Sequence, residues 1–230
     1  MEHSYCLHYA PDNASMIIRL ALEEQRVPYR TQLVDRRRHA QRAPAYLALN
    51  PHGLIPVLET SGDPVFETGA ILLFLSDAHG IIGPEPMNPK RGEMLKWLFY
   101  ISNTLHPSLR MMFYPHSFVG DAPAAQETLR KVQEANICTA LTRIDTYFAT
   151  ASDHAMLLDL YIAPILRWCA LYPRERDKGW FDLATYPALK QMVIALEGRA
   201  SCHTLQAAEG LGPTPFSAPC APQPPEGSAT

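Results

Sequence analysis

The sequence predicts an N-terminal α/β domain followed by an all-α helical bundle. Strand patterns and helix patterns alternate over residues 4–79 in the order β-α-β-α-β-β-α. Beyond residue 90 only long helical patterns follow, and the proline-rich stretch before it predicts a stiff linker. We therefore divide the chain into an α/β domain over 1–82, a linker over 83–90, an all-α domain over 91–210 and a Pro-rich tail over 211–230.

The N-terminal pattern begins with a strand, a helix and a second strand. Residues 4–9 and 29–34 alternate between two faces, which is typical of half-buried strands. Residues 14–25 carry an apolar stripe at helical spacing, and Asp12 or Asn13 is a candidate N-cap. Such a unit predicts two parallel strands joined by a right-handed crossover.

A hairpin and a helix should complete this domain. Residues 36–49 suit an irregular helical segment, and the turn Ser61-Gly62-Asp63 separates two short antiparallel strands. An apolar helix from about Thr68 to His79 should end at Gly80, since glycine best tolerates a left-handed C-terminal cap. The resulting sheet is mixed.

Helical spacing of apolar residues predicts the second domain. The expected helices lie at about 90–109, 124–147, 158–171, 186–197 and 201–209. In the tail, prolines recur among small residues, a composition that predicts no core of its own. The tail should either lie on the surface through Phe216 or remain mobile.

Composition limits the function classes. The chain has 230 residues, 47% of them hydrophobic, a formal charge of -3 and a pI near 6.3, which gives no overall basis for binding nucleic acid or an anionic membrane. A small molecule is the expected partner. Five scattered cysteines without a Cys-x-x-Cys pair predict neither a disulfide framework nor a metal site. An export signal and a long apolar run are both missing, which predicts a cytoplasmic protein.

Two motifs lie close together in the first domain. The first, Asn50-Pro51-His52-Gly53-Leu54-Ile55-Pro56-Val57-Leu58, is a turn that enters a strand at a proline. Because X-Pro bonds adopt the cis form at low cost, Ile55-Pro56 is a candidate cis peptide, with the Ile55 N–H and C=O free for a peptide-like ligand. The second, Phe66-Glu67-Thr68-Gly69-Ala70-Ile71, places an acid and a hydroxyl at a helix start, where unpaired N–H groups and the helix dipole favour a carboxylate.

In this order and spacing the two motifs resemble the glutathione-binding half of the cytosolic glutathione S-transferases. Trp97-Leu98, Thr104-Leu105-His106-Pro107 and Tyr186-Pro187-Ala188-Leu189 are similar to bacterial members, so the resemblance covers roughly residues 4–210 and is closest to the beta class. It implies a thioredoxin-like first domain, glutathione as co-substrate and a homodimer.

The resemblance also implies the parts of a glutathione site. The Ile55 main chain, beside Pro56, would pair with the cysteinyl unit, while Glu67 and Thr68 would receive the γ-glutamyl ammonium and carboxylate. The alternative is that Glu67 and Thr68 only stabilise their own helix. For the glycyl carboxylate we choose Arg42; the other candidates are Arg36, Arg37, Arg38, His39 and Gln41.

The thiol-activating group departs from the beta-class pattern. That class has Pro-Gly-Ala-Cys-Ser after the first strand, and this chain reads Pro11-Asp12-Asn13-Ala14-Ser15, so a mixed disulfide cannot form at alanine. We predict that Ser15 is catalytic and donates to the thiolate at the start of the first helix. Asn13 and Tyr9 are the alternatives.

An apolar acceptor pocket is expected in the second domain. His106, which matches a beta-class histidine near the thiol, should line it together with Asn103 and Phe113; further candidates are Tyr100, Met111, Met112 and Tyr114. The alternative for these side chains is an ordinary core role. Asp159 lacks the capping partner usual in the family, since Met156 stands three residues before it.

The predicted reaction is conjugation of glutathione thiolate to an electrophilic apolar small molecule, as in detoxification. The same site could serve a glutathione-dependent isomerase, dehalogenase or reductase, because specificity depends on a domain whose pattern does not identify a substrate. Outside the enzymes, the alternative is a non-catalytic binding or regulatory relative.

Overall fold

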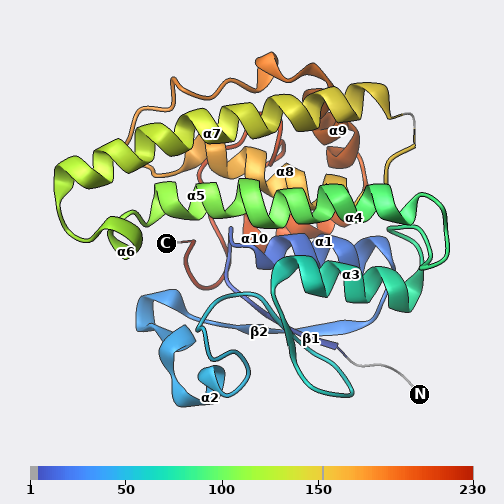
Figure 1. Cartoon of the computed structure of the whole chain (residues 1–230). Helices are drawn as coiled ribbons and strands as arrows, with labels where there is room; N and C mark the ends of the chain where they lie inside the picture. Colours follow the sequence, from blue (N-terminus) through green and yellow to red (C-terminus); the bar gives the residue numbers. More distant parts are fainter. Residues whose placement is uncertain (1–4, 152, 230) are drawn as a thin grey trace.

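A four-stranded mixed sheet lies at one side of the molecule (Figure 1). The computed structural model describes residues 5–151 and 153–229. The strands β1 (Tyr5–Tyr9), β2 (Tyr29–Leu33), β3 (Val57–Glu59) and β4 (Val65–Phe66) are arranged in the order β2-β1-β3-β4. β1 runs parallel to β2 and antiparallel to β3, and β3 pairs antiparallel with β4.

Helices cover the two faces of this sheet unequally. α1 (Ser15–Glu24) and α3 (Thr68–His79) lie on one face, and the short η1 (Arg36–Arg38), η2 (Ala40–Arg42) and α2 (Pro44–Leu47) lie on the other (Figure 1). Alternation along β1 explains this, because Tyr5, Leu7 and Tyr9 join the main core while Cys6 and His8 point the opposite way. The predicted β-α-β-α-β-β-α order and the thioredoxin-like fold are confirmed.

The second domain is helical, as predicted. Its elements are α4 (Arg91–Tyr100), a π-helical turn η3 (Ile101–Leu105), α5 (His106–Phe113), α6 (His116–Val119), α7 (Pro123–Thr150), α8 (Met156–Leu171), η4 (Leu183–Thr185), α9 (Pro187–Glu197) and α10 (Ala200–Glu209). The helix predicted from residue 90 therefore continues to Phe113 through one π-turn. The boundaries assigned to the domains and linker stay predictions.

α1 lies at the centre of the molecule. Its residues from Ser15 to Leu22 are all buried, and it packs against α3, α8 and α10. One hydrophobic core runs from the sheet through α1 into the helical domain. The loop that precedes α1 is consequently enclosed by both domains.

Asp12, in that loop, does not cap α1 as expected. The helix has no side-chain cap, and Asp12 has a left-handed backbone with φ of 50°. Its carboxylate accepts from Arg167 Nε and Nη2, both at 2.9 Å, from Trp168 Nε1 at 3.0 Å and from the Tyr172 hydroxyl at 2.7 Å. Donors from α8 and the residue after it thus use the lone pairs that would have capped the helix.

A second buried acid supports the same loop. Glu209, at the end of α10, accepts from the Asp12 N–H at 2.8 Å and from Arg19 Nε at 3.2 Å. Burial raises the pKa of Glu209 to about 7 despite the nearby Arg19 guanidinium. The loop before α1 is therefore held by α1, α8 and α10 together.

The tail is ordered rather than mobile as far as residue 229. Leu211 and Phe216 are fully enclosed in the main core, so the expected contact through Phe216 is observed. Arg167 donates to the Pro215 and Cys220 carbonyls, both at 3.0 Å. The proline-rich tail thus forms no core of its own, and its two apolar side chains pack into the core of the helical domain.

Among the described residues, no helix combines the length and apolarity that a membrane crossing requires.

The buried Asp12–Arg167 pair gives a stability prediction. Asp12→Ala should lower the free energy of unfolding by about 3–5 kcal/mol, because Arg167 would stay buried without its counter-charge. Urea unfolding followed by circular dichroism measures the change. Asp153→Ala, which removes the exposed partner of Lys90, is the matched control and should have a much smaller effect. Equal losses in the two variants would contradict the structural role of the buried pair.

Candidate functional site

The Asn50 turn is built by its own side chains. Asn50 is buried, donates from Nδ2 to the Leu54 carbonyl at 2.8 Å and accepts from the His52 N–H at 3.1 Å. Gly53 has φ of 62°, and a Cβ there would lie 2.8 Å from the Gln41 carbonyl oxygen. Only glycine meets both conditions without strain.

Ile55 follows this turn and precedes β3. The Ile55-Pro56 peptide is cis, as predicted. Among the described residues, the Ile55 main chain takes part in no loop or turn hydrogen bond. Its N–H and C=O are therefore available to an extended peptide.

Glu67 links β4 to α3 in a strained backbone conformation. Its φ is 71° and its ψ 116°, a region that costs a non-glycine residue about 1–3 kcal/mol. The Glu67 side chain forms no capping hydrogen bond with α3 and is exposed, while Thr68 is buried at the first helical position. Glu67 therefore does not cap α3 by a hydrogen bond, and the alternative that Glu67 and Thr68 only stabilise their own helix stays open.

Arg42 differs from the rest of the basic run. Arg36 donates to the Ala229 carbonyl and the Tyr114 hydroxyl, and Arg37 and Arg38 pair with Asp35. Arg42 lies beside the Asn50 turn, where a Cβ on Gly53 would approach its Nη1 to 3.1 Å. Within residues 5–151 and 153–229 the Arg42 guanidinium has no acidic partner, so it is available to a carboxylate.

Ser15 begins α1 but its hydroxyl is already used. The side chain is fully buried, donates to the Ala10 carbonyl at 3.0 Å and accepts from the Ala10 N–H at 3.2 Å. In this conformation the hydroxyl proton of Ser15 is not available to donate to a ligand. The catalytic role predicted for Ser15 stays a prediction, and the observed bonds favour a structural role in the loop.

Other polar groups at the start of α1 are not used in this way. Asn13 Oδ1 is buried without a hydrogen-bond partner in the described chain, and the N–H groups of Ala14 and Ser15 precede the first intrahelical bond, which Met16 makes to Asn13. Main-chain donors at a helix start stabilise an anion. The main-chain N–H groups of Ala14 and Ser15 are therefore candidates for stabilising a thiolate at the place where the beta class has its cysteine.

His106 packs in the helical domain against α8. Its Nδ1 lies 3.0 Å from the Tyr161 hydroxyl, and its ring contacts those of Tyr161 and Trp168. Burial, with a smaller effect from Arg110, lowers the pKa of His106 to about 4, so the imidazole is neutral at physiological pH. Burial and, secondarily, the negative charge of Glu67 raise the pKa of Tyr161.

The other two residues predicted for the pocket, Phe113 and Asn103, differ in burial. Phe113 is half-buried against Tyr114 and Tyr172, whereas Asn103 is exposed on the π-turn, where its Oδ1 accepts from Ser102. Sequence patterns missed Tyr161, because it meets His106 across 55 positions and no local spacing marks such a pair. Asp159 does not cap α8, and its Oδ1 lies 2.7 Å from His154 Nε2 in a hydrogen bond.

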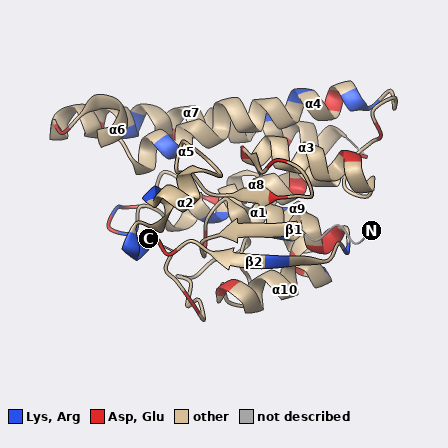
Figure 2. Ribbon diagram, turned by 90° about the horizontal axis from the view of Figure 1, so that it is seen from below, with Lys and Arg blue, Asp and Glu red and all other residues tan. Residues whose placement is uncertain are grey.

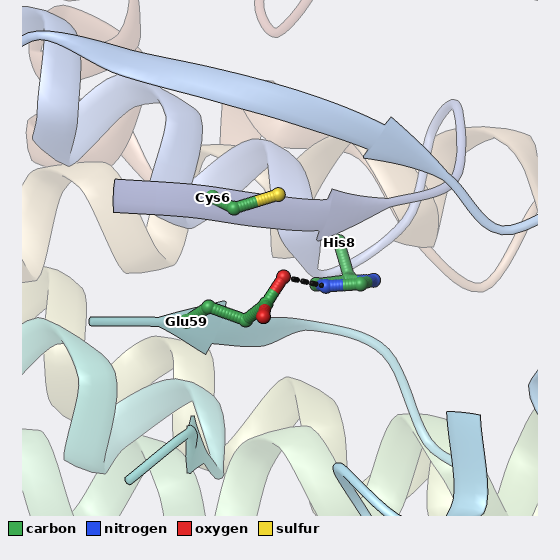
Figure 3. Close-up of side chains that lie close together, drawn as sticks. All are labelled: Cys6, His8 and Glu59. Atoms are coloured by element: carbon green, nitrogen blue, oxygen red, sulfur yellow. Dashed lines mark hydrogen bonds and ion pairs between the residues drawn. The ribbon is translucent and has the colours of Figure 1, made fainter. Parts of the chain in front are cut away.

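Cys6, His8 and Glu59 form a separate cluster on the α2 side of the sheet (Figure 3). One possible ligand atom from each lies within 4.8 Å of the others. His8 Nε2 is hydrogen-bonded to Glu59 at 2.7 Å, and Arg30 Nη2 lies 3.7 Å from the same carboxylate oxygen. A guanidinium so close opposes a metal cation, so the cluster is explained as an ion-paired network.

Comparisons with known proteins identify relatives of the sequence and of the fold. A family model described as the glutathione S-transferase N-terminal domain matches residues 14–78. Glutathione S-transferase F9 of Arabidopsis thaliana is 25% identical over 206 residues, covering 82% of this chain and 94% of the relative. Maleylacetoacetate isomerase of Rhizobium meliloti is 29% identical over 201 residues, covering 84% and 89%.

A solved structure shows the same fold over almost the whole chain. A glutathione transferase homologue from Sulfitobacter, crystallised with bound glutathione, superposes with a TM-score of 0.76 at 23% identity, covering 90% of this chain and 98% of that one. The fold is thus that of a thioredoxin-like domain joined to a helical domain. Over residues 14–78 this chain matches the glutathione S-transferase N-terminal domain, and over most of its length it is similar to glutathione S-transferases of plants and bacteria.

Proposed function

We propose that this protein is a glutathione transferase that conjugates the glutathione thiolate to an electrophilic carbon of an apolar small molecule. The observation that carries the proposal is the α3 start, where a strained Glu67 without a capping bond and a buried Thr68 adjoin the helix N-terminus. Glutathione is bound in several solved relatives of this fold, including the Sulfitobacter homologue. In the reaction the thiol loses its proton to solvent, and the sulfur then forms a bond to carbon as the leaving group departs with its electron pair.

The described residues can hold the tripeptide along its length. The Ile55 main chain beside Pro56 pairs with the cysteinyl unit, and Glu67 accepts from the γ-glutamyl ammonium. Thr68 and the α3 N-terminus receive the γ-glutamyl carboxylate. Arg42, which lacks an acidic partner in the described chain, receives the glycyl carboxylate.

Isomerisation is a second candidate for the same site. It is favoured by the similarity to maleylacetoacetate isomerase at 29% identity. Both reactions need the glutathione thiolate, and they differ in whether glutathione remains on the product. Mass spectrometry of the product after incubation with an electrophile and with a cis-enone distinguishes them. A chain that binds neither glutathione nor a conjugate would instead be the non-catalytic relative.

The proposed role of Glu67 is tested by Glu67→Gln. The variant should bind glutathione about 10–100-fold more weakly, because it loses a charge-assisted hydrogen bond worth about 1.5–3 kcal/mol. Titration calorimetry measures the dissociation constant. Glu85→Gln, an exposed acid before α4, is the matched control and should bind like the wild type. Unchanged binding in Glu67→Gln would refute this binding mode.

Two substitutions separate the candidates for thiol activation. Asn13→Ala should raise the pKa of bound glutathione by about 1–2 units if the amide stabilises the thiolate. Ser15→Ala should leave that pKa unchanged and lower stability by about 1–3 kcal/mol, because the Ala10 main chain loses its partner. Thiolate absorbance of the complex against pH measures both. A raised thiol pKa in Ser15→Ala alone would restore the catalytic role of Ser15.

We also propose a homodimer in the cytoplasm. Two large apolar side chains, Phe74 of α3 and Phe99 of α4, are exposed, and a second copy would cover them. Phe99→Asp should shift the protein toward monomer in sedimentation velocity. Ile194→Asp, which changes an exposed apolar residue of α9, is the matched control and should not. A wild-type monomer would contradict the proposal.

A further inference from the structure

Glu209 is a buried acid that the proposed reaction does not use directly. It is the last residue of α10, which packs against α1 (Figure 2), and its side chain is completely buried. A carboxylate in such a position is unfavourable unless hydrogen-bond donors and a nearby cation compensate its charge. The donors that Glu209 binds therefore indicate what it does.

Both donors connect Glu209 to the loop before α1, residues 10–14. Oε2 accepts from the Asp12 N–H at 2.8 Å. Oε1 accepts from Arg19 Nε at 3.2 Å, and the Arg19 guanidinium lies over the Tyr9 ring, 4.7 Å from its centroid. Since Tyr9 is the last residue of β1, one carboxylate holds the loop directly at Asp12 and, through Arg19, at the strand from which the loop leaves.

The backbone of Asp12 needs this support. Its φ is 50°, a conformation that a non-glycine residue keeps only where its surroundings hold it. Glu209 binds its N–H and Arg167 binds its carboxylate, while the Ser15 hydroxyl closes the loop onto α1 by its bonds to Ala10. The loop is therefore tied to the helix start that carries the free main-chain donors.

Protonation of Glu209 is incompatible with both hydrogen bonds at once. Each of its oxygens already accepts from an N–H donor, so a proton on either oxygen competes with the donor there. Loss of one bond frees Asp12, and loss of the other frees Arg19. Burial raises the pKa of Glu209 to about 7, so both forms occur near neutral pH.

The charged and titratable groups that face Glu209 come from three elements. Besides burial, which has the largest effect, Arg19 of α1 lowers the pKa of Glu209, and the Asp12 carboxylate of the loop raises it. The third group is Tyr9 of β1, which adjoins Arg19. α9 also packs against α10, but its Glu197 binds N–H groups of the tail instead. Arg19 is therefore the cation that keeps Glu209 ionisable.

We propose that Glu209 is a positioning residue for thiol activation. As a carboxylate it holds the loop before α1 so that the Ala14 and Ser15 N–H groups meet the glutathione thiolate, and on protonation it releases the loop. This inference rests on the proposed function, and it adds that thiolate formation and ionisation of Glu209 favour each other. Direct repulsion between the two anions would have the opposite effect.

The loop can be followed without glutathione through Trp168, whose Nε1 donates to the Asp12 carboxylate at 3.0 Å. In NMR spectra of protein with isotope-labelled tryptophan, the Trp168 indole signal should shift with a midpoint near pH 7, as Glu209 ionises. Glu209→Gln, which like the protonated acid has one accepting atom, should abolish this shift. Arg19→Gln should raise the midpoint by about one unit, because the carboxylate loses its cation, and it tests the assignment separately if Glu209→Gln does not fold.

Glu24→Gln is the matched control. Glu24 of α1 accepts from Arg199 Nη2 at 2.6 Å, at the start of α10, so this ion pair joins the same two helices at their other end. Its loss should leave the midpoint of the Trp168 signal unchanged. A Trp168 signal that does not titrate around neutral pH, or that titrates equally in Glu209→Gln, would overturn the inference.

Thiolate absorbance of bound glutathione against pH tests the link to the reaction. Glu209→Gln should raise the pKa of the bound thiol by about one unit, whereas repulsion alone would lower it. By reciprocity, the Trp168 midpoint of the wild type should be lower in the glutathione complex than in the free protein. An unchanged or lower thiol pKa in Glu209→Gln would overturn the inference. Absence of glutathione binding would instead refute the proposed function, and the Trp168 titration would still decide whether Glu209 controls the loop.

Discussion

The buried ion pair between Asp12 and Arg167 is the constraint on which the arrangement of the site depends. It joins the loop after β1 to α8, and both side chains are removed from water, so neither charge could stay there without the other. Two further donors, from Trp168 and Tyr172, complete the bonding of the carboxylate. Because the same Arg167 also donates to two tail carbonyls, one guanidinium determines where the loop, α8 and the tail lie relative to one another.

Three separate segments of the first domain carry the polar groups of the candidate site. The loop before α1 presents Asn13 and unpaired main-chain N–H groups, the Asn50 turn presents the Ile55 main chain, and the α3 start presents Glu67 and Thr68. The strained backbone at Glu67 persists because β4 and α3 hold it on both sides. The loop before α1 is supported by a polar network whose hydrogen bonds are satisfied, and it carries main-chain donors whose hydrogen bonds are not. This combination distinguishes the region from the core.

Much of the fold followed from local patterns. Alternation predicted β1 and β2, helical spacing predicted α7, α8, α9 and α10, and Gly80 marked the end of α3 as observed. The Asn50 turn and the α3 start were also recognisable, because their geometry depends on residues adjacent in sequence. The short α6 and the π-turn at Ile101–Leu105 were missed, since neither follows from a repeat of apolar residues.

The sequence by itself determined the element order of the first domain, its mixed sheet, the two motifs and the absence of a cysteine at the start of α1. Only the tertiary structure decided that Asp12 binds α8 instead of capping α1, that the Ser15 hydroxyl bonds to Ala10, and that Phe216 anchors an ordered tail. The physical reason is the separation in sequence between the interacting residues. Backbone propensity and periodicity act over a few residues, whereas a buried charge pairs with a counter-charge that helix packing brings close, here from 155 positions away.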